Sequence, residues 1–444
     1  MRHKISRKYL SFLGLFFILS ILGSCANYAT EENVSFWEVH TTDDFSSSEL
    51  SEVLREYLLY DFDYLTHQIL RYSPHLNVIE RRLGVNLEER FATARELIEN
   101  FPLYMATGRE RTSEELTRII AENFMNAHLE PLFRPVQIAH MAAYQSRQIE
   151  RYYFFHQSQF DIFKEENVRI FYRLDRENVP SFQPMMEINP NNIITDVIFE
   201  NYIAYLRIGS FVIDDTTFEN NRERLLDFFE KIQSYEHLII DLRGNMGGLP
   251  VFQRLVHELL IAEEQIPRIY QFFVRDYFGS RHNMSQMLEI DERNGIVIHT
   301  IEEFLETRNM YNVNLDDLAK MGYVVELNPR IIPDEDAVPF GGNIWILVDE
   351  SSASATELVV LTSQSTGFAT VVGSHTMGVM PSFTTLLSLP HTGIVVRFDT
   401  GYFTDETGRS LEEFGIEPDY FNREGLNALE TVLEMIEEMN EFGR

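Results

Sequence analysis

Two transitions from strand through turn to helix constrain the fold more than any other feature of this sequence. The apolar run Leu238–Leu242 leads through a glycine-rich turn into a helical pattern at Pro250–Ala262. The second apolar run, Ile344–Val348, is followed by small residues and then by an apolar helix at Ala355–Ser363. Short continuous apolar runs that alternate with helices are typical of buried parallel strands, so the sequence predicts an α/β core.

The residues before this core follow a different period. From Glu49 to about Ala127 apolar side chains recur three and four residues apart, which predicts helices. Short β-type patterns at Ile170–Leu174 and Asn201–Ile208 indicate a change to strands near residue 165. The predicted organisation is a helical domain over 49–165, an α/β core over 166–424 with a charged insertion at about 265–340, and a C-terminal helix over 425–444.

The first 24 residues have the composition of an export signal. Four cations precede an apolar run from Leu10 to Leu22 that is too short for a membrane-spanning helix. The run ends in Leu22-Gly23-Ser24-Cys25, which resembles a bacterial lipobox, and Cys25 is the only cysteine. A lipobox implies that residues 1–24 are removed as a signal peptide, that the Cys25 thiol carries acyl chains, and that residues 25–48 form a polar tether. The sequence therefore predicts a lipoprotein of the bacterial cell envelope, anchored on the extracytoplasmic side.

Charge and cysteine content exclude several classes of function. The formal net charge of −32 over 444 residues repels the phosphates of nucleic acids. A single cysteine permits neither an intrachain disulfide nor a cysteine-ligated zinc or iron–sulfur site. The sequence also lacks the glycine-rich motifs that bind nucleotides and dinucleotides. We therefore expect no nucleic-acid partner, no metal and no cofactor.

Both strand-to-helix turns carry groups suited to acyl transfer. The glycine-rich turn Asp241–Gly248 would present backbone N–H groups, which bind anions and oxyanions. The second turn would leave a hydroxyl at a helix N-terminus, where the helix dipole stabilises negative charge. Each turn also has a plain structural interpretation. The first is then an ordinary tight turn, and Ser351, Ser352 and Thr356 are helix caps.

Four short motifs follow one another along the chain. They are D-x-R-x-N-x-G-G at Asp241–Gly248, S-A-S-A-T-E at Ser352–Glu357, G-x-x-T-x-G at Gly373–Gly378, and G-I-x-P-D at Gly415–Asp419. These motifs resemble those of carboxyl-terminal processing (tail-specific) serine peptidases, which are related to the tricorn core. The resemblance covers roughly Ile203–Tyr420 and implies a ClpP/crotonase-like α/β core. Asp61–Leu65 and Ser73–His75 resemble the helical front end of lipoprotein members, and we expect no PDZ domain.

The resemblance implies that Ser354, the third position of S-A-S-A-T-E, is the nucleophile. It also implies an oxyanion hole of backbone N–H groups, which we assign to Gly247 and Ala355. Many of these peptidases carry a lysine base directly after T-x-G. This sequence has Val379 there, and its last lysine is Lys320. Another group must therefore act as the base.

Histidine is the base in the tricorn-like branch, where a D-x-H-type motif closes the helical domain. The corresponding stretch here contains His128, which makes it the first candidate, and His375 is the lower-ranked one. The branch also uses a glutamate in an E-x-x-G-I stretch and a serine beside the histidine. Glu412 matches the glutamate, whereas Ala127 replaces the serine. A carboxylate beside the imidazole would orient the ring and stabilise its protonated form.

These features predict a lipid-anchored extracytoplasmic serine endopeptidase that forms an acyl-enzyme on Ser354. Its predicted partners are a polypeptide substrate and, through Cys25, a membrane, while the sequence carries no sign of an oligomeric state. A competing hypothesis is a catalytically inactive lipoprotein of the same fold that binds peptides or apolar ligands. The missing lysine at Val379 is the observation that favours this second hypothesis.

Overall fold

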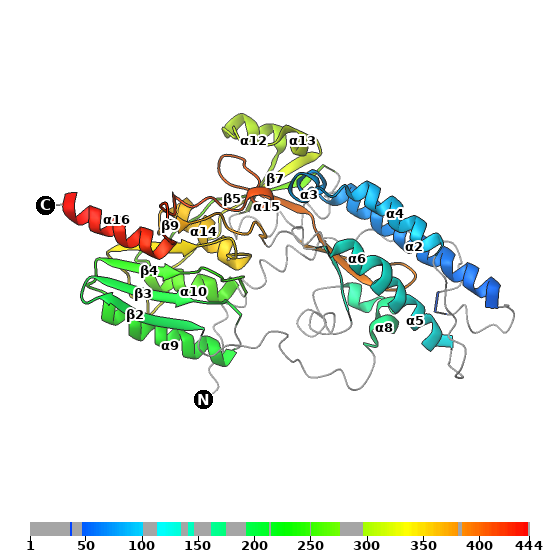
Figure 1. Cartoon of the computed structure of the whole chain (residues 1–444), viewed down its shortest axis with the longest axis horizontal. Helices are drawn as coiled ribbons and strands as arrows, with labels where there is room; N and C mark the ends of the chain where they lie inside the picture. Colours follow the sequence, from blue (N-terminus) through cyan, green and yellow to red (C-terminus); the bar gives the residue numbers. More distant parts are fainter. Residues whose placement is uncertain are drawn as a thin grey trace. The chain divides into compact units, whose positions relative to one another are not determined.

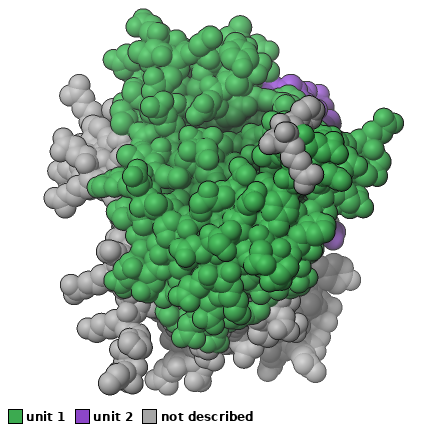
Figure 2. All heavy atoms as spheres, turned by 90° about the vertical axis from the view of Figure 1, so that its left-hand side faces the viewer, with its two compact units in different colours: residues 1–15, 184–382, 402–444 green, residues 16–183, 383–401 purple. Residues whose placement is uncertain are grey.

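The computed structural model describes residues 36–37, 47–100, 113–134, 141–145, 161–174, 192–212, 215–248, 250–275, 296–380 and 384–442. The signal peptide, Cys25 and most of the predicted tether lie outside these residues. The chain divides into two compact units, coloured separately in Figure 2. Unit 1 comprises residues 1–15, 184–382 and 402–444, and unit 2 comprises residues 16–183 and 383–401.

The described part of unit 1 is built on a six-stranded sheet (Figure 1). Its strands are β2 (Ile193–Phe199), β3 (Ile203–Ile208), β4 (His237–Asp241), β8 (Asn343–Val348), β9 (Thr370–Gly373) and β13 (Tyr420–Phe421). The order across the sheet is β13-β9-β8-β4-β3-β2. β2 runs antiparallel to β3, and every other neighbouring pair is parallel. This sheet confirms the predicted α/β core.

Helices pack on both faces of this sheet. They are α9 (Asp215–Ile232), α10 (Pro250–Leu260), α14 (Ala355–Thr366) and α16 (Ala428–Phe442). On one face Ile239 and Leu347 pack against Val432 and Ile436 of α16. On the other face Ile240 and Ile346, which adjoin Ile239 and Leu347 in the same strands, line a small apolar cavity with Val256 of α10 and Val359 of α14. Because side chains alternate along a strand, β4 and β8 present apolar residues to both faces of the sheet.

A second sheet accounts for the stretch predicted as a charged insertion. Its described strands are β5 (Ile269–Val274), β6 (Ile296–Thr300), β7 (Met321–Leu327) and β12 (Gly401–Thr404), in the order β12-β5-β7-β6. Two short helices, α12 (Ile301–Thr307) and α13 (Leu315–Leu318), contact β7. The insertion is thus a folded layer, and β12 joins it from much later in the sequence.

Unit 2 contains the predicted N-terminal helices. Those described are α2 (Ser47–Tyr72), α3 (Leu76–Leu83), α4 (Leu87–Glu99), α5 (Ser113–Phe124), α6 (Glu130–Phe133) and α8 (Glu166–Tyr172). A hairpin of β10 (Thr384–Ser388) and β11 (Val395–Asp399) belongs to the same unit, and β11 also pairs with β1 (Ala142–Ala143). Unit 2 is therefore completed by a segment that lies more than 200 residues beyond its helices in sequence.

Two sequence expectations differ from the structure of unit 2. The strand predicted at Ile170–Leu174 is wrong, because residues 166–172 form α8, which buries Val168, Phe171 and Tyr172 at helical spacing. Within the predicted tether, Phe36 and Trp37 are buried, and Phe36 packs edge-on against Tyr57 at 6.0 Å between ring centroids.

Within the described residues, no helix combines the length and apolar composition that crossing a bilayer requires.

Candidate active site

Ser354 lies where the chain turns from β8 into α14, and its backbone is strained. Its φ of 57° and ψ of −120° fall in a region that L-residues rarely occupy. Its neighbours Ala353 and Ala355 are buried, whereas Ser354 is partly exposed. A serine raised on a sharp strand-to-helix turn at a helix N-terminus is the geometry of a nucleophile in serine hydrolases.

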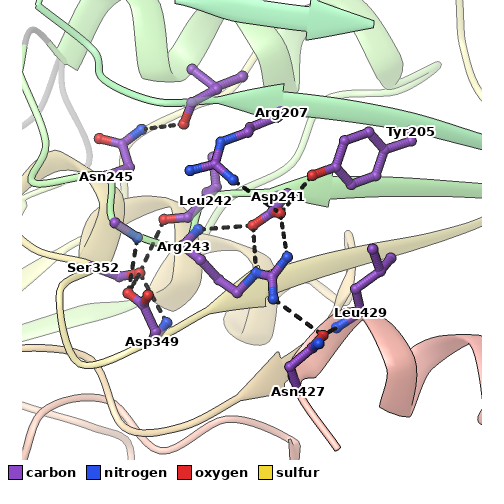
Figure 3. A network of polar contacts seen from close by, with 12 residues as sticks. Tyr205, Arg207, Asp241, Leu242, Arg243, Asn245, Asp349, Ser352, Asn427 and Leu429 are labelled. Atoms are coloured by element: carbon purple, nitrogen blue, oxygen red, sulfur yellow. Dashed lines mark hydrogen bonds and ion pairs between the residues drawn. The ribbon is translucent and has the colours of Figure 1, made fainter. Parts of the chain in front are cut away.

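The other hydroxyls of this turn have structural partners. Ser352 is fully buried, and its Oγ donates to the carbonyl oxygen of Leu242 at 3.1 Å. Thr356 Oγ1 donates to the carbonyl oxygen of Asn245 at 2.9 Å. Figure 3 shows Ser352 beside Asp349, whose carboxylate accepts the Gly244 N–H at 2.9 Å. These contacts join the turn to the loop after β4, whereas the N-cap of α14 is Ser354 and neither Ser352 nor Thr356.

The loop after β4 begins at an ion-pair network drawn in Figure 3. The carboxylate of Asp241 is fully buried and accepts two bonds from the Arg243 guanidinium at 2.9 and 2.7 Å, and one from Tyr205 Oη at 2.7 Å. Burial acts to raise the pKa of Asp241, but the bonds from Arg243 and Tyr205 outweigh it and hold this pKa below its usual value. Arg243 also donates to Asn427, just before α16, at 3.2 Å. The network fixes the start of the glycine-rich loop.

Gly247 lies directly against Ser354. Its φ is +93°, and a Cβ built there would lie 2.8 Å from Ala353 O, from Ala355 N and from Ser354 Cβ. No larger residue fits this position without moving the backbone. The loop is also tied to the turn by the carbonyl oxygen of Asn245, which accepts the Ala353 N–H at 3.1 Å. The first two motifs are therefore in contact.

The two predicted oxyanion donors differ in their present hydrogen bonds. Among the described residues, the Ala355 N–H has no acceptor, so it is available to an oxyanion. The Gly247 N–H donates to Asn245 Oδ1 at 2.9 Å, while Asn245 Nδ2 donates to the carbonyl oxygen of Ile208 at 3.0 Å. Gly247 can therefore serve an oxyanion only when the Asn245 side chain releases its N–H.

The third and fourth motifs contact the turn that carries Ser354 through Thr376 and Val379. The Ser354 N–H donates to the carbonyl oxygen of Val379 at 3.0 Å. The Thr376 N–H donates to the carbonyl oxygen of Ile416 at 3.1 Å, and Thr376 Oγ1 accepts the Ile416 N–H at 2.8 Å. A Cβ at Gly415 would lie 2.1 Å from the carbonyl oxygen of Thr376. All four motifs are thus assembled at one place in unit 1.

Glu412 reaches this assembly on α15 (Leu411–Phe414), the one-turn helix that precedes Gly415. Its side chain is fully buried. The helix begins at Ser410, whose side chain accepts the Glu413 N–H at 3.3 Å. Glu412 therefore belongs to the same unit as Ser354, as the fourth motif does.

The His375 ring lies beside side chains of the fourth motif and of β13. Its Nε2 lies 3.7 Å from a carboxylate oxygen of Glu417, and its ring centroid lies 5.1 Å from that of Phe421. About a third of its side chain is exposed, at 36%. The backbone of its loop does approach the nucleophile, since the Met377 N–H donates to the carbonyl oxygen of Ser352 at 2.9 Å.

His128 lies in unit 2, on a π-helical turn (η1, Met125–Leu129) between α5 and α6. The sequence placed it at a helix end, whereas the helix continues through it with one widened turn. Such π-turns occur frequently at functional sites. The His128 side chain is 8% exposed, and burial lowers its pKa below the usual value. A neutral imidazole at neutral pH suits a general base.

Sequence analysis missed two groups at the site. Glu357 is fully buried and accepts hydrogen bonds from the nucleophile turn and from the Thr376–Val379 loop, and Asn245 holds the Gly247 N–H. Both belong to the motifs, but nothing in a motif shows which backbone groups its polar side chains reach. No group of histidine, cysteine, aspartate and glutamate side chains in the described residues could hold a metal ion.

This arrangement defines a hydrolase of the serine type, with a strained serine at a helix N-terminus and a glycine loop against it. Residues 202–421 match the model of peptidase family S41, and the chain belongs to this family of serine peptidases. No curated protein sequence matches the chain significantly.

Several solved structures are similar to this chain at low identity. A putative peptidase from Parabacteroides merdae is 15% identical, with 82% of this chain and 96% of that chain covered and a TM-score of 0.40. Mature CPAF is 12% identical, with 83% and 93% covered and a TM-score of 0.45. The photosystem II D1 C-terminal processing protease is 16% identical, with 56% and 53% covered and a TM-score of 0.34.

Proposed function

We propose that this protein is a lipid-anchored extracytoplasmic serine endopeptidase of the tail-specific or tricorn type, in which Ser354 is the nucleophile. The observation that carries the proposal is the strained backbone of Ser354 with Gly247 packed against it. A costly backbone conformation persists only where surrounding contacts impose it, and such conformations cluster at active sites. The strained turn presents the Ser354 hydroxyl at a partly exposed position, where a substrate can reach it.

The proposed reaction follows the acyl-enzyme route. The base takes the proton of Ser354 Oγ as this oxygen attacks the peptide carbonyl carbon, and the carbonyl oxygen becomes an oxyanion. The Ala355 N–H and, once Asn245 releases it, the Gly247 N–H stabilise the oxyanion. The base then gives its proton to the leaving amine, and water hydrolyses the acyl-enzyme by the reverse sequence of proton transfers.

We assign the base to His128 and its orienting carboxylate to Glu412, with His375 as the alternative base. The lowered pKa of His128 supports this choice, because a neutral imidazole accepts a proton. Val379, at the position of the family's lysine, supplies no base. A non-catalytic protein of the same fold that binds peptides or apolar ligands is the alternative that this departure favours.

The fluorophosphonate reaction tests the nucleophile directly, because this probe phosphonylates only an activated serine. We expect labelling of the wild type and of Ser351→Ala, a control on the same turn, and no labelling of Ser354→Ala. Casein hydrolysis should fall about 10⁴- to 10⁶-fold in Ser354→Ala, as for other serine nucleophiles. A folded wild-type protein that neither labels nor hydrolyses casein would establish the binding alternative instead.

The lipid anchor is a separate part of the proposal. It rests on the basic and apolar leader and on the position of Cys25, the only cysteine, directly after Leu22-Gly23-Ser24. Metabolic labelling with palmitate in a bacterial host should mark the wild type and leave Cys25→Ala unmarked and unanchored. Incorporation of lipid into Cys25→Ala would overturn the anchor and leave the peptidase proposal intact.

A further inference from the structure

A buried carboxylate in the first turn of α14 binds both the nucleophile and the loop after β9. Glu357 Oε1 accepts Thr376 Oγ1 at 2.5 Å and the Gly378 N–H at 2.8 Å. Glu357 Oε2 accepts the Val379 N–H at 2.9 Å and the Ser354 N–H at 3.1 Å. The residue is fully buried, and none of the ion pairs in the described part of the chain involves it.

The four donors account for all the acceptor positions of this side chain. An ionised carboxylate offers about four lone-pair sites on two oxygens, and each oxygen of Glu357 here takes two donors. Hydrogen bonds to a charged acceptor are stronger than neutral ones, and in a buried site they are not weakened by water. No acceptor position is left for a proton from the substrate or from Ser354 Oγ, so Glu357 does not act as a base.

The contacts of Glu357 converge on the strained residue. The Ser354 N–H is shared between Glu357 Oε2 and the carbonyl oxygen of Val379, so two fixed acceptors define its direction. Val379 is itself held by its own N–H on Glu357 Oε2. A backbone conformation of this kind costs about 1–3 kcal/mol and persists only where surrounding contacts impose it. Glu357 supplies those contacts.

We propose that Glu357 is a positioning residue for peptide hydrolysis, whose carboxylate holds Ser354 and the Thr376–Val379 loop in one arrangement. This inference rests on the proposed function of Ser354 as the nucleophile. It predicts a loss in the rate of attack with little change in substrate binding, because Glu357 touches neither the substrate nor the reacting atoms. It also predicts that an amide cannot replace the carboxylate, since an NH₂ group would face two donors.

The first test is Glu357→Gln, measured by kcat and KM on a peptide substrate, by fluorophosphonate labelling rate and by active-site titration. We expect kcat and the labelling rate of the folded protein to fall about 10- to 100-fold, as for a reacting group misplaced by about 1 Å. We expect KM to stay within about threefold of the wild type, in keeping with an interaction that acts on the transition state.

A second pair of variants serves where Glu357→Gln does not fold. Thr376→Val removes one donor to Glu357, together with the acceptor of the Ile416 N–H, with almost no change of volume, and it should lower kcat about 2- to 10-fold. Thr376→Ser keeps the hydroxyl and should restore the wild-type rate. Such a rescue would not follow from a role in packing alone.

Each outcome decides the inference. A folded Glu357→Gln protein that labels at the wild-type rate overturns it, and so do equal rates for Thr376→Val and Thr376→Ser. A lower thermal midpoint with an unchanged rate per titrated site also overturns it, because that result describes a stabilising residue only. Labelling that persists in Ser354→Ala refutes the proposed function itself, whereas serine-dependent labelling that ignores Glu357 refutes only the positioning role.

Discussion

Each unit contains a fully buried carboxylate whose hydrogen-bond donors are all uncharged. The two carboxylates fix different parts of the chain. Glu357 in unit 1 joins residues of neighbouring motifs around the nucleophile. Asp61 in the middle of α2 accepts the backbone N–H groups of His391 and Thr392, both at 2.8 Å, and the Thr392 hydroxyl at 2.7 Å. Burial raises the pKa of both acids, and that of Asp61 to about 7. Glu357 binds residues around Ser354, whereas Asp61 fixes the β10–β11 hairpin, which lies far from it in the sequence.

The β10–β11 hairpin is held from several directions within unit 2. Asn167 Nδ2 donates to the carbonyl oxygen of Pro390 at 2.6 Å, and Tyr172 Oη accepts the Val395 N–H at 3.0 Å. His75 Nε2 lies 2.8 Å from the carbonyl oxygen of Gly401, where this segment ends. The hairpin follows the Thr376–Val379 loop in the sequence, so the chain passes from unit 1 to unit 2 shortly after this loop. The contacts of Glu357 thus lie among the motif residues of unit 1, whereas those of Asp61 fix the β10–β11 hairpin within unit 2.

The largest expected effect tests whether unit 2 also takes part in the chemistry. His128→Ala should reduce turnover about 10²- to 10⁴-fold, the usual contribution of a general base. In the wild type, activity should fall on the acid side as His128 becomes protonated, at a pH below the ordinary histidine pKa of 6.5 because burial lowers this pKa. The measurement is the pH dependence of kcat/KM for casein-derived peptides.

His375→Ala is the matched control for His128→Ala, and it should keep most of the activity.

A gain-of-function variant at Val379 provides a second test of the base. Val379 already touches Ser354 through its carbonyl oxygen, so a lysine side chain at this position would begin beside the nucleophile. Val379→Lys in the His128→Ala background should recover part of the activity, with an optimum at higher pH. Wild-type turnover in His128→Ala would leave unit 2 with a structural role only.

The next largest effect concerns the glycine loop of unit 1. Gly247→Val should lower turnover about 100- to 1000-fold, or about 3–4 kcal/mol, because a side chain there displaces Ser354 and Ala355 from the oxyanion. Gly244→Ala is the matched control, since Gly244 also has a positive φ, of +75°, but a Cβ there meets nothing within 4 Å.

We expect Gly244→Ala to lose about 1 kcal/mol of stability through its backbone conformation and to keep its turnover. The readouts are casein hydrolysis, fluorophosphonate labelling and the thermal midpoint of each variant. Equal activity in the two folded glycine variants would remove the oxyanion loop from the mechanism.

Sequence alone identified the four motifs that meet in unit 1, because a few of their backbone positions admit very few residues. Gly247 accepts no Cβ, and the strained turn at Ser354 requires small neighbours, so these positions leave a readable motif. The bonds that connect the motifs run largely through backbone atoms. A sequence does not display those partners, which is why Glu357 and Asn245 received no role beforehand.

Unit 2 was less predictable because long-range contacts determine it. The apolar period of α2 shows which face is buried, yet nothing near Asp61 indicates that Thr392 lies against it, 331 residues away. A short apolar run is ambiguous between strand and helix, which is how α8 was predicted as a strand at Ile170–Leu174. The widened turn at His128 also has no sequence signal of its own.

A smaller effect is expected at the carboxylate of unit 2. Asp61→Ala leaves three donors without their acceptor and should cost about 2–3 kcal/mol of unfolding free energy. Asp63→Ala is the control two residues away, because its half-exposed ion pair with Arg95 should contribute about 1 kcal/mol or less. Chemical denaturation measures both, and equal losses would refute the anchoring role of Asp61.

The raised pKa of Asp61 gives a pH dependence with a defined sign. The unfolded chain releases this proton near pH 3.8, whereas the folded chain retains it until about pH 7. The contribution of Asp61 to stability is therefore complete below about pH 4 and is lost as the pH rises through about 7. Relative to Asp61→Asn, which cannot titrate, the wild type should become less stable across this range. A constant difference between the two would contradict the raised pKa.

The smallest expected effect is a gain in stability at the nucleophile itself. Ser354→Gly relieves a backbone conformation that costs about 1–3 kcal/mol, and the greater freedom of glycine in the unfolded chain offsets about 0.5–1 kcal/mol of this. We expect a net gain of about 1 kcal/mol in unfolding free energy together with complete loss of labelling. Asn201→Gly is the control, since Asn201 in the β2–β3 turn also has a positive φ, of 59°, which asparagine tolerates. Asn201→Gly should gain little and keep full activity. Equal gains at the two positions would show that the strain at Ser354 is that of an ordinary turn, whereas a gain confined to Ser354 identifies strain kept for catalysis.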